Sequence, residues 1–138
     1  MSKTYKKVQV WIGSEPNQVL LFKVIEKRGG GWHPVTGSVE KEDSSLLVAA
    51  KRETQEETGI DAEVGEWKDL DYFFEFTGQW GHASEHAFGL FLPQKPKKIH
   101  LDPGEHSECE WVSAEEALNR LSFPDQKRAL KKFLCYLK

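Results

Sequence analysis

The sequence lacks a hydrophobic run near the roughly 20 residues that a helix needs to cross a bilayer. Its start, MSKTYKKVQV, also lacks the apolar stretch of a signal peptide, so we expect no contact with a membrane. Cysteine is scarce, because Cys109 and Cys135 are the only two. Two cysteines are too few for a disulfide framework, which favours reduced thiols and a cytoplasmic protein. We expect Cys135, which falls in an apolar helical pattern, to be a small core residue.

An excess of charge of one sign is also missing. The formal net charge is −3, and the isoelectric point is about 6.0. A general nucleic-acid binder is normally basic, so this balance argues against nucleic acid as a partner. It leaves room for an enzyme that holds a single polyphosphate through a metal ion. The 138 residues are 38% hydrophobic and show no repeat or linker, which predicts one domain over residues 1–138 with its own core.

Alternating and β-branched segments separated by turn residues predict a series of strands. The expected strands cover Val8–Ile12, Gln18–Glu26, Trp32–Thr36, Ala62–Trp67, Tyr72–Thr77, Glu85–Leu92 and Glu110–Val112. The expected helices cover Ser45–Thr58, a segment from Ser113 with a capping box to Glu116, and Asp125–Leu137. In the first helix, the residues expected toward the core are Leu46, Leu47, Ala49 and Ala50. This order of strands and helices indicates a layered α/β (α+β) domain.

The most informative segment is Arg52-Glu53-x-x-Glu56-Glu57-x-Gly59. Residues three and four apart share one face of a helix. Glu53, Glu56 and Glu57 therefore point the same way, one turn before a glycine that can end the helix. Carboxylates this close repel each other, whereas a hard divalent cation such as Mg²⁺ or Mn²⁺ needs them together. The alternative for such a cluster is the solvated face of an ordinary helix.

The surrounding residues separate these two interpretations. Gly37 follows a strand-like segment, and a helix start at Asp43-Ser44-Ser45 follows an acidic loop. Together with the acidic turn, this resembles the Nudix hydrolase signature over residues 37–60, Gly-x5-Glu-x7-Arg-Glu-x-x-Glu-Glu-x-Gly. The chain departs from that pattern in two ways. Asp43 stands in place of the first Glu, and eight residues rather than seven separate Asp43 from Arg52.

The resemblance implies an α/β/α sandwich around a mixed β-sheet, and a Mg²⁺-dependent (or Mn²⁺-dependent) hydrolase of phosphoric anhydride bonds. The metal ligands that it implies are Glu53, Glu56, Glu57, Glu105 as a distal acid, and a backbone carbonyl at Gly37 or Thr36. The alternative for Glu105 is an ordinary loop acid. Arg52 would orient the acids and the loop through charge-assisted bonds, with either Asp43 or Glu42 as its partner in the loop. Glu53, Glu56 and Glu105 all stay open as the base that accepts the proton of the attacking water.

The phrase Val35-Thr36-Gly37-Ser38 resembles the bacterial dihydroneopterin triphosphate pyrophosphohydrolase branch of the family, as do Tyr5-Lys6, Ser84–Phe88 and Glu105-His106. Val24 is apolar where that branch would place a basic contact. This resemblance implies cleavage of dihydroneopterin triphosphate or a dNTP to a monophosphate and pyrophosphate. The expected substrate contacts are Thr36, Lys6 (or Lys7) and His33.

Alternatives remain open for the substrate and the role of the chain. The substrate is otherwise a dinucleoside polyphosphate or the 5′-triphosphate end of RNA, and the chain is otherwise a non-catalytic nucleotide-binding regulator. The expected partner is a small-molecule polyphosphate, and the chain is a monomer or a homodimer. Four aromatic residues, Phe73, Phe74, Phe76 and Trp80, could stack on a base or pterin ring or pack in the core.

Overall fold

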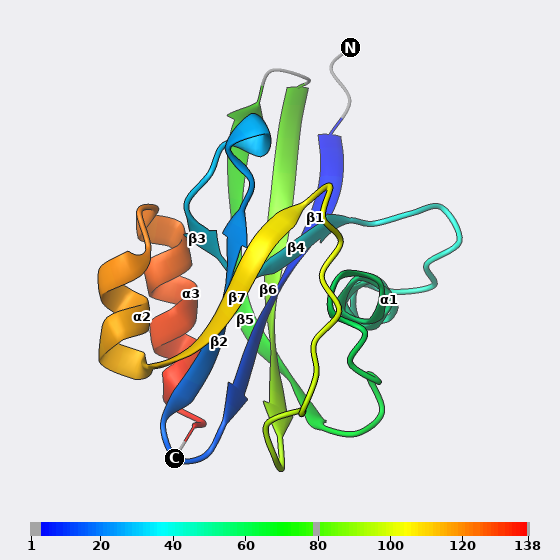
Figure 1. The fold of residues 1–138 in the computed structure, drawn as a ribbon. Helices are drawn as coiled ribbons and strands as arrows, with labels where there is room; N and C mark the ends of the chain where they lie inside the picture. Colours follow the sequence, from blue (N-terminus) through cyan, green and yellow to red (C-terminus); the bar gives the residue numbers. More distant parts are fainter. Residues whose placement is uncertain (1–3, 79–80, 138) are drawn as a thin grey trace.

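The computed structural model describes residues 4–78 and 81–137. It shows a mixed β-sheet between two helical layers, with α1 (Leu46–Thr58) on one face and α2 (Ala114–Arg120) and α3 (Pro124–Leu134) on the other (Figure 1). The expected α/β/α sandwich around a mixed sheet is therefore confirmed. Within the described residues, no helix is long and apolar enough to cross a membrane.

The sheet is built around β1. Its strands are β1 (Thr4–Ser14), β2 (Gln18–Val24), β3 (Trp32–His33), β4 (Val35–Ser38), β5 (Glu66–Gly78), β6 (Gly81–Leu92) and β7 (His106–Ser113), and a short 3-10 helix, η1 (Glu26–Arg28), follows β2. The strand order is β3-β2-β1-β6-β5, with β4 paired to β1 and β7 paired to β2. The pair β1–β6 is parallel and the other pairs are antiparallel.

β1 contributes side chains to both hydrophobic cores, because its successive side chains alternate between the two faces of the sheet. Val8, Val10 and Ile12 belong to the core beneath α1, whereas Trp11 belongs to the core beneath α2 and α3. Successive side chains of a strand point to opposite faces, so a strand covered on both faces reads as an almost continuous apolar run. Gln9 interrupts that run and is fully buried on the same face as Trp11, to which it is hydrogen-bonded.

Local capping signals set the limits of α1. The Ser45 hydroxyl accepts a hydrogen bond from the Val48 backbone N–H at 3.1 Å, as an N-cap does. Gly59 ends the helix at φ 73°, a left-handed conformation that glycine adopts without a steric penalty. Ala49 and Ala50 are buried as predicted, and Leu46 is half-buried.

Three predictions about packing and strand limits are wrong. Leu47 is exposed, because it lies about 100° around the helix from Leu46. Cys135 is exposed, because it caps α3 beyond the buried face formed by Leu130 and Phe133. The two strands expected over Ala62–Trp67 and Tyr72–Thr77 are one strand, β5, with an irregularity between Asp69 and Phe73.

That irregularity in β5 is centred on Asp71, which has a positive φ of 53°. It lets the strand continue while its side-chain alternation shifts, as a β-bulge does. Phe74 and Phe76 therefore lie on the face of Tyr72, whose hydroxyl donates to Asp125 in α3 at 2.6 Å. Phe73 lies on the opposite face and is 63% exposed.

Candidate functional site

The acidic turn of α1 lies in a pocket of about 630 Å³ between α1, β4, η1 and the loop before β7. Seven of the predicted site residues line this pocket: His33, Thr36, Gly37, Glu53, Glu56, Glu57 and Glu105. The fold therefore brings together the signature helix, its glycine loop and the distal acid, which are far apart in sequence.

Arg52 connects the acids of the pocket to the loop. Its Nε and Nη2 donate to the two oxygens of Asp43 at 3.0 and 2.9 Å, and its Nη1 donates to Glu53 and Glu56 at 2.9 and 3.0 Å. The two-pronged bond with Arg52 holds the pKa of Asp43 below its ordinary value. Asp43, rather than Glu42, is thus the loop acid that binds Arg52.

The extra residue of the signature lies outside the pocket. Ser44 is exposed in a bend between Asp43 and the helix cap Ser45. The shorter Asp43 side chain still reaches Arg52 because the loop folds tightly around it: Asp43 Oδ2 also accepts from the Glu40 backbone N–H at 2.7 Å. The bend absorbs the insertion, and the acidic turn keeps its place in the pocket.

The absence of a side chain at Gly37 leaves space for the Glu53 carboxylate. A Cβ atom at position 37 would overlap the Glu53 side chain, so any other residue would push that acid away. Gly37 is held in β4 opposite Val8 of β1. Burial against this backbone raises the pKa of Glu53, and the bond from Arg52 partly opposes the rise.

Glu57 is buried with an unsatisfied oxygen. Within the described residues, its Oε2 has no hydrogen-bond partner, and the same is true of the neighbouring His106 Nδ1, 3.5 Å away. Burial, followed by the charges of Glu105 and Glu53, raises the pKa of Glu57 to about 7. Burial lowers the pKa of His106. A buried polar atom without a partner is costly, which indicates that a further group binds here.

Three carboxylates converge at this position. One oxygen each from Glu57, Asp102 and Glu105 lie within 4.8 Å of one another. Oxygen ligands at this spacing suit a hard divalent cation, and Glu57, which carries the orphaned oxygen, is one of the three, so the residues fit the metal that the signature implies. Ligation by Glu53, Glu56 and the Gly37 carbonyl stays a prediction, since Arg52 binds both of these carboxylates.

Asp102 was missed by the sequence analysis. It lies in a turn, and its backbone oxygen accepts from the N–H groups of Glu105 and His106, both at 2.9 Å. The turn thereby carries Asp102 and Glu105 together to Glu57. The available signal was the Asp-Pro-Gly-Glu phrase, a turn with an acid at each end.

The basic residues that line the acidic pocket do not include Lys6. Lys7 lines the acidic pocket, and both Lys6 and Lys7 line a separate small hollow near Phe73. Adjacent residues of a strand point to opposite faces, and of these two lysines only Lys7 lines the acidic pocket. Substrate contact by Lys6 stays a prediction. Lys27 and Arg28 of η1 also line it, and Arg28 Nη2 lies 3.3 Å from Glu105.

His33 is held by two hydrogen bonds. Its Nε2 lies 2.9 Å from the Gly30 carbonyl oxygen, and its Nδ1 lies 3.1 Å from Gln126 Nε2. Burial lowers the pKa of His33, which favours the neutral ring. Thr36, on β4, lies opposite Gln9 of β1. Both predicted substrate contacts therefore stand at the pocket wall, and their roles stay predictions.

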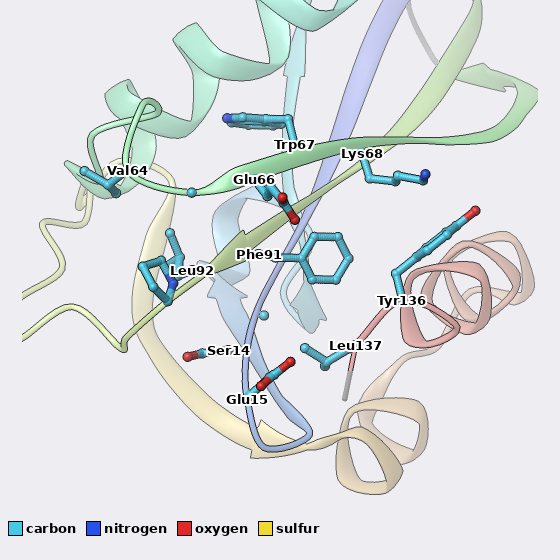
Figure 2. Close-up of a pocket in the computed structure, with 13 residues that line it drawn as sticks. Ser14, Glu15, Val64, Glu66, Trp67, Lys68, Phe91, Leu92, Tyr136 and Leu137 are labelled. Carbon is cyan, nitrogen blue, oxygen red and sulfur yellow. The ribbon is translucent and has the colours of Figure 1, made fainter.

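A second hollow, of about 620 Å³, lies toward the other end of β1 (Figure 2). Gly13 lines it, whereas Lys7 lines the acidic pocket, and six residues of strand place these positions roughly 20 Å apart. Figure 2 shows Phe91 between Glu66 and Leu137, with Tyr136 and Lys68 at one side. Its acids, Glu15 and Glu66, are exposed. The converging carboxylates thus single out the first pocket as the candidate site.

Comparisons with known proteins agree with this geometry. A family model described as the NUDIX domain matches residues 5–133. A bis(5′-nucleosyl)-tetraphosphatase (asymmetrical) of Sus scrofa is 31% identical over 130 residues, covering 86% of this chain and 84% of that protein. An octanoyltransferase of Myxococcus xanthus is 34% identical over 121 residues, covering 83% of this chain but only 32% of that protein.

A solved structure is also similar to this chain over most of its length. The E. coli dihydroneopterin triphosphate pyrophosphohydrolase superposes with a TM-score of 0.81 at 26% identity, covering 96% of this chain and 99% of that chain. The expected class, a hydrolase that acts on phosphoric anhydride bonds, is confirmed by the domain match and by these relatives. The chain belongs to the NUDIX domain family, as its acidic helix and glycine loop indicated.

Proposed function

We propose that this chain is a Mg²⁺-dependent (or Mn²⁺-dependent) pyrophosphohydrolase that cleaves a nucleoside triphosphate-like substrate to a monophosphate and pyrophosphate. The observation that carries the proposal is the group of Glu57, Asp102 and Glu105 around an unsatisfied buried oxygen. A surface without a ligand gains nothing from carboxylates held this close, because they repel each other. A divalent cation bound there neutralises phosphate charge and polarises the phosphorus–oxygen bonds.

The other residues of the pocket position the substrate and the acids. Lys7, Lys27 and Arg28 attract a polyphosphate to the rim of the pocket. Arg52 holds the Glu53 and Glu56 side chains in place through hydrogen bonds to both carboxylates. We assign Glu53 as the acceptor of the water proton, because it is buried against Gly37 and its raised pKa makes it a stronger base than an ordinary carboxylate.

The proposed substrate is dihydroneopterin triphosphate or a dNTP. The E. coli dihydroneopterin triphosphate pyrophosphohydrolase, similar over nearly its whole length, supports this choice. The second candidate is a dinucleoside polyphosphate, which the identity to the Sus scrofa tetraphosphatase favours. An RNA 5′-triphosphate and a non-catalytic role are the remaining alternatives. A cytoplasmic location accords with two free cysteines, and the chain is a monomer or a homodimer.

A turnover screen separates these substrates. The chain is incubated with Mg²⁺ and dihydroneopterin triphosphate, dATP, dGTP, Ap4A, Gp4G or triphosphorylated RNA, and the products are identified by mass spectrometry. The proposal predicts a monophosphate and pyrophosphate from a triphosphate. Preferred cleavage of Ap4A or Gp4G would move the assignment to the second candidate. Binding without turnover of any substrate would indicate the regulator instead.

A further inference from the structure

A third hollow, of about 280 Å³, lies between β5, β6 and the start of α3. Phe74, Phe76, Phe123 and Pro124 form its apolar walls. Two of these rings come from the face of β5 that the bulge at Asp71 turns toward α3. A hollow with aromatic walls suits a planar ring, which would stack on them. The chemistry proposed above uses none of these residues.

A buried acid lies among these apolar walls. Glu85 is only 5% exposed, and its Oε2 accepts a hydrogen bond from Gln9 Nε2 at 2.7 Å. Gln9 Oε1 in turn accepts from the Trp11 indole N–H at 2.6 Å. This chain of bonds fixes the rotamer of Glu85 and uses only one of its oxygens. Burial raises the pKa of Glu85 to about 7, opposed by Gln9 and Lys7 and assisted by Asp125.

A second acceptor in the hollow is Gln126, and its orientation follows from His33. The Gly30 carbonyl can only accept, so the His33 Nε2 beside it carries the proton. In the neutral ring Nδ1 is then an acceptor, and the amide of Gln126 must donate to it through Nε2. The Gln126 Oε1 is left buried and, within the described residues, without a partner. Gln126 is 6% exposed, so this oxygen has little access to water.

The hollow shares a wall with the acidic pocket. His33 lines the acidic pocket, and its ring lies 5.8 Å from that of Phe123, which lines the hollow. The bond from Gln126 to His33 crosses the same wall. The two hollows are therefore neighbours, as a substrate with its phosphates at the carboxylates and its ring among the phenylalanines requires.

We infer that this hollow binds the heteroaromatic ring of the substrate, with Glu85 and Gln126 as two acceptors that recognise a 2-amino-4-oxopyrimidine edge. That edge offers a ring N–H beside an exocyclic NH₂, and guanine and pterins share it. Adenine offers one donor beside an acceptor nitrogen, which leaves one of the two buried oxygens unpaired. The inference rests on the proposed function and names the ring that the enzyme selects.

The experiment compares rings that carry the same phosphates. Catalytic efficiency is measured at about pH 8, where Glu85 is mostly ionised, for dGTP, dihydroneopterin triphosphate and dATP. Wild-type protein should prefer the first two over dATP by about 10-fold or more. Glu85→Gln should remove most of that preference. The ratio of dGTP to dihydroneopterin triphosphate then tells which of the two rings is the better substrate.

Two exposed phenylalanines provide a matched pair of variants. Phe123→Ala should weaken binding of every ring about 3- to 10-fold through lost stacking, whereas Phe73→Ala, on the other face of β5, should change none of them. Both side chains are more than half exposed, so neither change should impair folding. Equal effects of the two variants would overturn the inference, as would a wild-type preference for dATP.

Failure of this inference is distinguishable from failure of the proposed function. Binding of the non-hydrolysable α,β-methylene analogues of dGTP and dATP is measured by calorimetry, which needs no turnover. A guanine preference that is lost in Glu85→Gln supports the ring site even if no triphosphate is cleaved. Efficient cleavage without any preference between the rings overturns the ring site and leaves the hydrolase in place.

Discussion

Glu105 is the acid outside the signature for which the structure most directly supports a metal-binding proposal. Alone in the sequence it could be an ordinary loop acid, yet its carboxylate converges with those of Glu57 and Asp102. It also lies 3.3 Å from Arg28, but that ion pair is largely exposed and contributes little to stability. Its place beside the unsatisfied oxygen of Glu57 therefore points to a role in metal binding.

If Glu105 holds the metal, Glu105→Gln should lower kcat and kcat/KM by similar factors of about 10-fold or more. The reason is that the lost charge acts in the transition state. Steady-state kinetics with Mg²⁺ in excess measures both constants. The control is Glu108→Gln, an exposed acid three residues further on, which should be nearly silent. Glu105 is a loop acid only if its variant behaves like this control.

At the scale of elements, the loop before α1 and the helix itself are joined by Arg52. The guanidinium bonds to Asp43 and to the Ser38 carbonyl oxygen on the loop side, and to two acids of the helix. The Asp43 side chain is only 4% exposed, so its loss leaves part of Arg52 without a partner. The loop holds its shape through this pair rather than through the length of the acid.

Asp43→Ala should therefore loosen the loop and lower turnover, but less than Glu57→Gln does. We expect the free energy of unfolding to fall as well, because Arg52 loses its bidentate partner. Urea denaturation and turnover are measured in parallel, with the exposed neighbour Glu42→Ala as the control. A loss of turnover as large as that of Glu57→Gln would place Asp43 in the metal site itself.

Elements with local end signals were predictable, and those set by distant contacts were not. Ser45 and Gly59 fixed both ends of α1 because capping depends only on neighbouring residues. The single strand β5 could not be foreseen, since its bulge at Asp71 depends on pairing with β6. Which of Lys6 and Lys7 lines the acidic pocket depends on which face of β1 is turned toward it, and the sequence alone does not fix that orientation.

The candidate site was predictable in part for the same reason. Glu53, Glu56 and Glu57 share one helix, so their spacing alone places them together. Asp102 comes from a turn more than forty residues away in sequence, and no periodicity marks it. Cys135 was expected in the core and is exposed, because helical spacing does not show where α3 ends.

At the scale of the whole molecule, buried acids make stability depend on pH. The folded-state pKa of Glu85 is about 7, above its ordinary value of 4.5. The unfolded chain therefore releases this proton first, and the free energy of unfolding falls as pH rises from about 4.5 to 7, then levels off. Over the range from 4.5 to about 7, this loss amounts to roughly 3 kcal/mol.

Glu85→Gln should remove this contribution, because its amide stays neutral. Relative to wild type, the variant should become more stable between about pH 5 and pH 8 by up to roughly 3 kcal/mol. Guanidinium denaturation at several pH values measures the difference. The control is Glu66→Gln, an exposed acid of β5, which should track the wild type throughout. Parallel curves for wild type and Glu85→Gln would show that Glu85 is ionised in the folded protein at all these pH values.

The most direct test of the whole account is the metal dependence of pyrophosphate release. Release from dihydroneopterin triphosphate or dGTP is followed for wild type with Mg²⁺, for wild type with EDTA, and for Glu57→Gln with Mg²⁺. We expect EDTA to abolish release and Glu57→Gln to reduce turnover at least about 100-fold, roughly 2.7 kcal/mol of barrier, while the variant stays folded. Undiminished release in EDTA, or by Glu57→Gln, would contradict the metal site around Glu57, Asp102 and Glu105.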